Sequence, residues 1–428
     1  MTRRRKRPNL FGWTVFGLVV LFGYYFNQVY LPAKPNPFDA TPTVTRSPES
    51  FVTEAEELFR QGKLPQSIDA YQSAINASPQ SPALYIALAR TQVWAGQYEE
   101  AQANAENAIL LNPENSTAHA VRAWALDFQG DNSKAMDAIT QAIDLDPNNA
   151  LAHAYFVEIL VDSNSFDNYG KAAEESKKAL ALDSNLMEAR RARGYILSTL
   201  GSEGNNYELA VQEYRAAIEL NPNIPLLRIE LGQNLRMLQV YDEAIDEFTF
   251  ANTLNPPDPE PDFLISRTYA TIGEYTKALQ YAETAMKDEP TSPGLHGNYG
   301  VMLYRNFLYQ QALDELSLAV NGGKTEDGFP IKGLSLTTNA RVAEYYFTYG
   351  LALARLNQCG KALPVAQSLQ TNVPADENAT FAASEIIRIC QENLENPPVD
   401  TPVSTTAEAT EEPTVTETET PAEGTATP

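Results

Sequence analysis

The sequence predicts an all-α solenoid of stacked helix pairs, with one membrane-spanning helix before it and a disordered tail after it. Three observations support this prediction. Proline recurs every 34 residues along much of the chain, alanine recurs at fixed distances before each proline, and both ends differ in composition from the middle. A fixed period of this length is typical of repeat proteins, whose units bury their apolar faces against one another.

The N-terminal segment has the features of a signal anchor. Residues 1–8 are strongly basic, and residues 9–31 contain no charged side chain. Within them Leu10–Phe26 would form about 26 Å of helix, at the short end of what spans a bilayer. The positive-inside rule then places residues 1–8 in the cytoplasm and the repeat domain on the extracytoplasmic side. A cleaved secretory signal is the alternative, but residues 27–32 offer no small residues for cleavage.

Two segments are predicted to lie outside the folded core. Residues 32–49 are rich in Pro, Thr and Ser, a composition typical of a semi-extended spacer. Residues 396–428 contain no aromatic residue and no cation, and they are rich in Thr, Pro, Glu and Ala. Because such a segment cannot bury enough apolar surface to offset the entropy cost of ordering, we predict a disordered acidic tail.

Residues 50–376 are predicted to form about nine repeats. Their terminators fall into two sets of prolines spaced by 34 residues, with one serine between the sets: Pro79, Pro113, Pro147, Ser184, Pro222, Pro256 and Pro290. Alanine stands five residues before every terminator, and twelve residues before every one except the first. These offsets place small residues on one helical face, where a neighbouring helix can approach closely. Proline then ends each helix at the same point.

Each repeat also contains a first helix and a turn, which precede the helix just described. Tyrosine recurs fifteen residues before five of the terminators, and glycine precedes that position in several units, as at Gly62, Gly96, Gly130 and Gly273. The pattern of helix, tight turn, helix and proline resembles the tetratricopeptide repeat. Small residues of the first helices match the family's small-residue position: Ala89, Ala123, Gly194, Gly232 and Gly300. The resemblance covers about residues 50–375 and implies a right-handed α-α superhelix, with residues 377–395 as a capping helix.

Several functional classes are disfavoured. The formal net charge of −24 repels phosphate backbones, so we expect no nucleic-acid binding. We find no phosphate-binding glycine loop and no hydrolase or zinc-protease motif, so we expect no enzyme activity and no cofactor. The three histidines, His119, His153 and His296, each lie six residues after a terminator. This shared repeat position favours packing roles over metal binding.

A partner-binding groove follows from the resemblance, since first helices line the concave surface in this family. The groove-facing candidates are Arg90, Trp124, Asp127, Glu158, Arg191, Tyr195, Gln233, Arg236, Arg267, Tyr304, Arg305 and Phe347. Arginine provides a planar fork for carboxylates, and aromatic rings provide stiff apolar contact. We therefore expect an extended segment of acidic or C-terminal character. The alternative is that these arginines only neutralise adjacent acids.

The two cysteines, Cys359 and Cys390, are predicted to pair. Outside the cytoplasm such a disulfide would close a loop of 31 residues and stabilise the fold by roughly 3 kcal/mol. Two buried free thiols are the alternative.

Together these features predict a non-catalytic, membrane-anchored scaffold or adaptor. Its partners would be other proteins or peptides in its groove and the lipid bilayer through residues 9–31. The alternative is a regulatory or assembly subunit of a cell-envelope enzyme or secretion complex.

Overall fold

The computed structural model describes residues 10–26, 46–325 and 327–395. Its first helix, α1 (Leu10–Tyr25), covers part of the predicted anchor. Among these described residues, none of the helices combines the length and the apolar character needed to cross a bilayer. The flanks of the predicted anchor, most of the spacer, residues 1–8 and the predicted tail lie outside the described residues.

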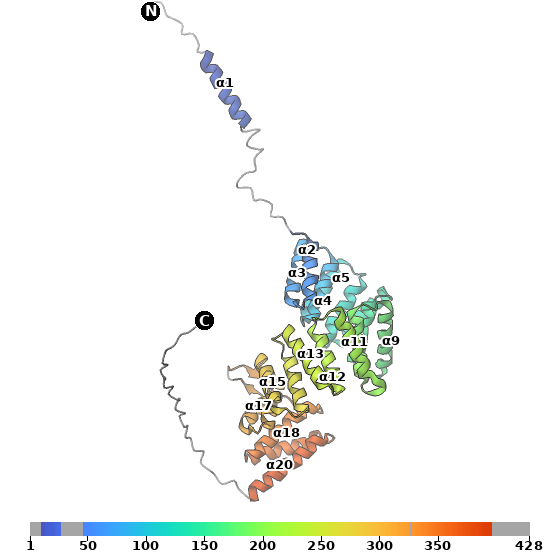
Figure 1. Cartoon of the computed structure of the whole chain (residues 1–428), viewed down its shortest axis with the longest axis vertical. Helices are drawn as coiled ribbons and strands as arrows, with labels where there is room; N and C mark the ends of the chain where they lie inside the picture. The colour runs from blue at the N-terminus through green and yellow to red at the C-terminus, as the bar shows by residue number, and fades with distance from the viewer. Residues whose placement is uncertain (1–9, 27–45, 326, 396–428) are drawn as a thin grey trace, which may run out of the picture. The chain divides into compact units, whose positions relative to one another are not determined.

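The rest of the described chain is an all-α repeat solenoid, divided into two compact units (Figure 1). In the first unit, residues 1–255, six helix pairs follow one another among the described residues. Their helices are α2 (Pro48–Arg60), α3 (Leu64–Ala77), α4 (Pro82–Trp94), α5 (Tyr98–Leu111), α6 (Ser116–Phe128), α7 (Asn132–Leu145), α8 (Ala150–Asp162), α9 (Phe166–Leu182), α10 (Met187–Leu200), α11 (Asn206–Leu220), α12 (Pro225–Met237) and α13 (Tyr241–Leu254). A short 3-10 helix, η2 (Glu203–Asn205), precedes α11.

The second unit, residues 256–428, continues the pattern with three further pairs in its described part. These are α14 (Pro259–Thr271) with α15 (Tyr275–Asp288), α16 (Pro293–Arg305) with α17 (Tyr309–Asn321), and α18 (Ala340–Arg355) with α19 (Cys359–Asn372). A final helix, α20 (Glu377–Glu395), covers the residues predicted for the cap. Before α18, two short antiparallel strands interrupt the helices: β1 (Gly323–Lys324) and β2 (Pro330–Ile331). The repeat pattern of the sequence does not predict these strands.

Small residues make the close packing within each pair possible. The alanines at both repeat positions are fully buried, as Ala101 and Ala108 are in α5. In α12, a Cβ on Gly232 would lie 2.5 Å from the Phe248 ring of α13, a distance that real Cβ atoms essentially never show. The recurring small residue is therefore required because the partner helix presents a large ring at that position.

In each turn within a pair, one residue has a left-handed backbone conformation. Gly62, Gly96 and Gly130 have positive φ, and Asn164 takes the same position 34 residues later. A second series, again with spacing 34, consists of Asn205, Gln239, Gly273 and Phe307. Glycine adopts this conformation without steric cost, and asparagine adopts it more readily than other side chains do. The glycine pattern in the sequence therefore marks a backbone requirement that some repeats meet with other residues.

Candidate functional site

The inner side of the first unit is filled by side chains. Trp124 (α6) and Tyr155 (α8) stack with ring centroids 4.2 Å apart, and Trp94 (α4) meets Trp124 edge-on at 5.1 Å. The unit is curved so tightly that the turn after α2 contacts the loop before α12. There the Asn223 side chain donates a 2.7 Å hydrogen bond to the Arg60 carbonyl. The first and sixth pairs are thereby in contact.

A buried charge network crosses this interior. Arg191 (α10) is 3% exposed and donates hydrogen bonds of 2.6 Å to Glu158 (α8) and 2.7 Å to Glu230 (α12). The Trp124 indole also donates a hydrogen bond to Glu158, at 2.8 Å. Of the predicted groove residues, Trp124, Asp127, Glu158 and Arg191 are therefore buried among one another. They do not line an open groove, because the tight curl of the unit covers them.

Carboxylates exceed cations in this interior. Burial raises the pKa of Glu158 to about 7, although Arg191 and the Trp124 hydrogen bond lower it. Burial and the neighbouring Asp162 raise the pKa of Asp127 to about 9. One oxygen each of Asp127 and Glu158 is buried without a hydrogen-bond partner. Ionising both groups would therefore cost free energy.

The remaining candidates of the first unit are less deeply buried. Arg90 pairs with Glu188 (α10), and the Tyr195 hydroxyl donates to Asp162. Gln233 and Arg236, both in α12, are half-buried. For Arg90 and Arg191 the geometry matches the alternative in which arginine neutralises a nearby acid.

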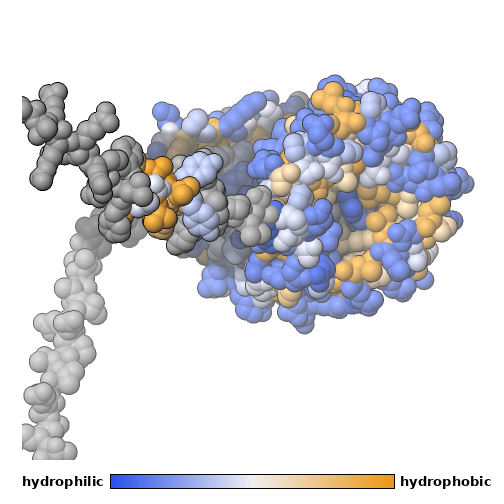
Figure 2. All heavy atoms as spheres, turned by 90° about the horizontal axis from the view of Figure 1, so that it is seen from above, coloured by the Kyte–Doolittle hydropathy of each residue, from blue (hydrophilic) through white to orange (hydrophobic). Residues whose placement is uncertain are grey.

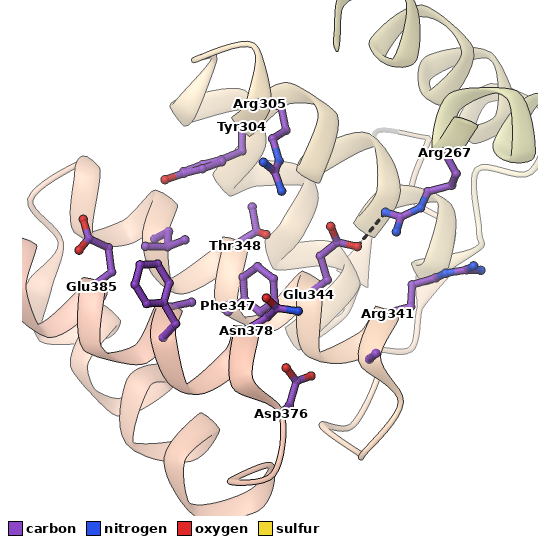
Figure 3. Close-up of a pocket in the computed structure, with 14 residues that line it drawn as sticks. Arg267, Tyr304, Arg305, Arg341, Glu344, Phe347, Thr348, Asp376, Asn378 and Glu385 are labelled. Carbon is purple, nitrogen blue, oxygen red and sulfur yellow. Dashed lines mark hydrogen bonds and ion pairs between the residues drawn. The ribbon is translucent and has the colours of Figure 1, made fainter. Parts of the chain in front are cut away.

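In the second unit, the first helices and the cap surround an open cavity of about 600 Å³ (Figure 3). Arg267 extends from α14, Tyr304 and Arg305 from α16, and Phe347 from α18, so four predicted groove residues meet here. The repeat pattern of the sequence did not predict the other functional groups of this cavity. They are Arg341 and Glu344 of α18 and Asp376, Asn378, Phe381 and Glu385 at or near the start of α20. These residues do not follow the repeat spacing, because an insertion precedes α18 and because α20 is not part of a helix pair.

The acids of the cavity already have partners. Glu344 accepts a 2.7 Å hydrogen bond from Arg267, and Glu385 pairs with Arg388 outside the cavity. Asp376 accepts the amide of Ala379 at 3.0 Å, in the first turn of α20. Glu344 and Glu385 are therefore already paired with cations, whereas Asp376 caps α20 through one oxygen and keeps its negative charge.

Two arginines of the cavity have no such partner. Arg305 lies over the Tyr275 ring at 5.7 Å, and Arg341 lies over the Phe263 ring at 4.7 Å. Among the residues that the structure describes, neither forms an ion pair. Beside them, Phe347 is half-buried and Phe381 is 74% exposed. The cavity thus presents two guanidinium groups together with apolar rings.

The predicted disulfide involves α20, which forms one wall of this cavity. Cys359, at the start of α19, and Cys390, in α20, are joined with their sulfurs 2.21 Å apart. Since α20 contributes Phe381 and Glu385 to the lining, the bond ties the cap, and with it one side of the cavity, to the preceding repeat.

The three histidines occupy one repeat position, as their spacing indicated. In each, Nε2 lies 2.9 Å from the carbonyl oxygen of the terminating proline six residues earlier. His153 and His296 also contact Glu175 and Glu315 through Nδ1. Within residues 10–26, 46–325 and 327–395, no group of three His, Cys, Asp or Glu side chains is arranged to hold a metal ion.

Outside the cavities, the face seen in Figure 2 is largely hydrophilic, and its apolar residues lie in small separate groups. Scattered apolar residues are normal on a protein surface and do not mark a binding site. Cavities are therefore the better candidates for partner binding on this face.

Comparison with known proteins identifies the repeats. One tetratricopeptide repeat model matches residues 58–125, and a second matches residues 116–149 and 194–224. The chain therefore contains tetratricopeptide repeats in these stretches, which confirms that part of the prediction. No curated protein matches the chain.

Two similar solved structures have low sequence identity. The first is described as the APC/C hetero-tetramer Cut9-Hcn1, with 15% identity and a TM-score of 0.46 over 63% of this chain, which spans 50% of that one. The second is a tetratricopeptide repeat protein from Parabacteroides merdae, with 17% identity and a TM-score of 0.39. That match covers 60% of this chain and 98% of the other.

Proposed function

We propose that this protein is a non-catalytic scaffold or adaptor that binds a segment of a partner protein in the cavity between α14, α16, α18 and α20. Tetratricopeptide repeats generally mediate protein–protein interactions through concave surfaces of this kind. The observation that carries the proposal is the pair Arg305 and Arg341, which line the cavity without an ion pair among the described residues.

The chemistry of the cavity favours a partner segment with a carboxylate next to an apolar side chain. Guanidinium groups bind carboxylates through paired, planar hydrogen bonds, and they are weakly hydrated compared with ammonium groups. Phe347 and Phe381 offer apolar contact beside them. Because Glu344 and Glu385 already have cation partners, they compete little for the two arginines.

Site-specific photo-crosslinking in the native host tests this proposal. A photoreactive phenylalanine analogue replaces Phe381 in the cavity, or Gln367 on the exposed surface of α19 as a matched control. We expect discrete adducts from position 381 only, and we expect Arg305→Ala with Arg341→Ala to abolish them. Equal adducts at both positions, or adducts that survive the double substitution, would show that the cavity is not the binding site.

The proposal includes an anchor over residues 9–31 and an extracytoplasmic repeat domain. Its support is the uncharged segment that follows a basic N-terminus. Protease treatment of intact cells carrying an epitope at each end tests this part. Digestion of the repeats with survival of a short membrane stub supports the anchor, whereas protection of the repeats until lysis refutes this topology.

A further inference from the structure

A polar contact closes the first unit on itself. The Asn223 side chain, in the loop between α11 and α12, donates a 2.7 Å hydrogen bond to the Arg60 carbonyl at the end of α2. Asn221, at the start of the same loop, donates a longer bond of 3.4 Å to the Phe59 carbonyl. These partners are 163 and 162 residues apart in the chain. In a linear array each repeat contacts only its neighbours, so a contact between the first and sixth pairs needs an explanation of its own.

The burial of Asn221 shows that this contact is specific to one place in the repeat array. Asn221 directly follows the second helix of its pair, and it is 4% exposed. The corresponding residues of four other repeats are all exposed: Asn112, Asp146, Asp183 and Asn255. Among these five residues Asn221 alone is buried, because the end of α2 lies against it.

Gly62, in the turn after α2, is adapted to the same contact. A Cβ at this position would lie 2.6 Å from the carbonyl oxygen and 2.9 Å from the Cβ of Asn223. At Gly96 and Gly130, the equivalent turn positions of the next two pairs, a Cβ would meet no atom within 4 Å. All three positions have a positive φ, which favours glycine. Of the three, only Gly62 is also required by the close approach of a distant repeat.

Two further contacts link α4 to α10, which belong to the second and fifth pairs. Arg90 of α4 forms an ion pair with Glu188 of α10, 98 residues away. The Arg191 guanidinium of α10 lies over the Trp94 ring of α4, 5.7 Å from its centroid. The closed form is therefore held by the first and sixth pairs and, next to them, by the second and fifth.

The closed form also has a cost that opening would relieve. Asp127 and Glu158 are buried, and one oxygen of each has no hydrogen-bond partner among the described residues. Water that enters an opened unit would satisfy both oxygens. The bonds from Asn221 and Asn223 end on backbone carbonyls that water can also satisfy. Breaking them therefore costs much less free energy than separating the buried alanines within a helix pair.

We propose that Phe59, Arg60, Gly62, Asn221 and Asn223 form a latch that opens without unfolding of the helix pairs and thereby controls access to the concave side of the first unit. In the closed form the latch keeps the buried charge network covered, and in the open form solvent or a partner reaches it. The inference does not depend on the proposed function, since that concerns a cavity of the other unit.

Amide hydrogen exchange of the full chain tests whether the latch opens. Asn223→Ala removes its shorter hydrogen bond, so exchange in α2 (residues 48–60) should become about tenfold faster. Exchange in α6, in the middle of the unit, should not change. Asn148→Ala is the matched control, because Asn148 also follows a terminating proline and its side chain is exposed. This control should leave exchange in α2 unchanged.

The indole hydrogen of Trp124 reports access to the concave side, because this residue is fully buried and its indole donates to Glu158. Trp124→Phe identifies its ¹⁵N–¹H signal by its loss. In the Asn223→Ala variant we expect exchange of this hydrogen with solvent to accelerate about tenfold, together with α2.

Gly62→Ala tests the latch from its other side. Gly96→Ala is the control, since the two glycines have φ of +73° and +75° but only a Cβ on Gly62 would meet Asn223. Gly62→Ala alone should accelerate exchange in residues 221–237, and equal effects of the two substitutions would overturn the inference. Unchanged exchange of α2 in Asn223→Ala, equal acceleration of α6, or an unchanged rate for the Trp124 indole would each overturn it as well.

Discussion

At the residue scale, the left-handed turn position shows how one backbone requirement is met in different ways. Gly273 and Phe307 occupy this position in successive repeats, with φ of +84° and +63°. A side chain with a Cβ is strained in this region by about 1–2 kcal/mol, whereas glycine is not. Phe307 gains little burial in return, because the residue is 76% exposed.

We therefore expect Phe307→Gly to stabilise the protein. Relief of strain outweighs the extra chain entropy that glycine gives the unfolded state, so the free energy of unfolding should rise by about 0.5–1 kcal/mol. Urea denaturation measures this change. Gly273→Ala is the matched reverse substitution, because a Cβ there meets no atom within 4 Å and only strain can act. A destabilised Phe307→Gly variant would contradict the argument.

Asp127 should make stability depend on pH. Its folded-state pKa of about 9 lies far above the value of about 3.9 in unfolded chains, so the folded protein holds a proton that the unfolded chain releases. The stability that this group contributes is complete below about pH 4 and falls as pH rises towards 9. Asp127→Asn imitates the protonated form and avoids this loss.

We expect Asp127→Asn to be more stable than the original protein at pH 8, by on the order of 1–3 kcal/mol, and nearly equal to it at pH 4. Thermal melts at pH 4, 6 and 8 measure the difference. Asp137→Asn, an exposed acid on α7, is the control and should change little at any pH. A difference that stays constant across the series would show that Asp127 is already ionised in the folded protein.

The groove residues show what sequence can predict at this scale. Repeat phase predicted Arg267, Tyr304, Arg305 and Phe347 as groove residues, and all four line one cavity. The same phase gave no means of knowing that Trp124 and Arg191 would be covered. Whether such a side chain is covered by other repeats depends on the curvature of the stack. That curvature is the sum of small rotations between successive repeats. The phase of a residue within its own repeat does not contain that information.

At the element scale, helices such as α3 and α5 were predictable because they carry stop signals and a fixed phase of small residues. Pro79 and Pro113 follow the ends of α3 and α5, and buried alanines keep a fixed phase within both helices. The strands β1 and β2 carry no such signal, since two residues are too few for a periodic pattern. Arg341, Asp376 and Phe381 were missed for a related reason, since their helices follow an insertion or stand outside the pairs.

The cap α20 should depend on its disulfide. Cys359 and Cys390 close a loop of 31 residues, so reduction should lower the free energy of unfolding by roughly 3 kcal/mol. Denaturant titrations with and without dithiothreitol measure this loss. Cys359→Ala with Cys390→Ala is the control and should not respond to the reductant. Two alkylatable thiols in the unreduced protein would refute the pairing.

At the scale of the whole molecule, the concave sides of the two units differ. The first unit buries stacked rings and the charge network around Arg191 there, whereas the second has a larger open cavity lined by two arginines without an ion pair among the described residues. Arg191 contacts acids from α8 and α12, so it joins three successive repeats of the first unit. A repeat protein is held together by contacts between neighbours, and this residue acts across two such junctions.

We therefore expect Arg191→Met to destabilise the first unit and to leave the cavity of the second intact. Glu158 and Glu230 would stay buried without their cation, at a cost of about 3–5 kcal/mol. Their pKa values, already raised by burial, would rise further. The deficit should therefore be smallest below about pH 4.3, where these carboxyls are protonated in both states, and should grow as pH rises through neutrality.

Urea denaturation at pH 4 and pH 8, with crosslinking at position 381 as the readout for the second unit, measures both effects. Adding Glu158→Gln and Glu230→Gln to Arg191→Met removes the uncompensated charges, so this triple variant should recover much of the stability at pH 8. A deficit of equal size at both pH values would mean that lost packing, and not buried charge, is the cause. Loss of crosslinking by Arg191→Met in the native host would mean that the network also supports the cavity of the second unit.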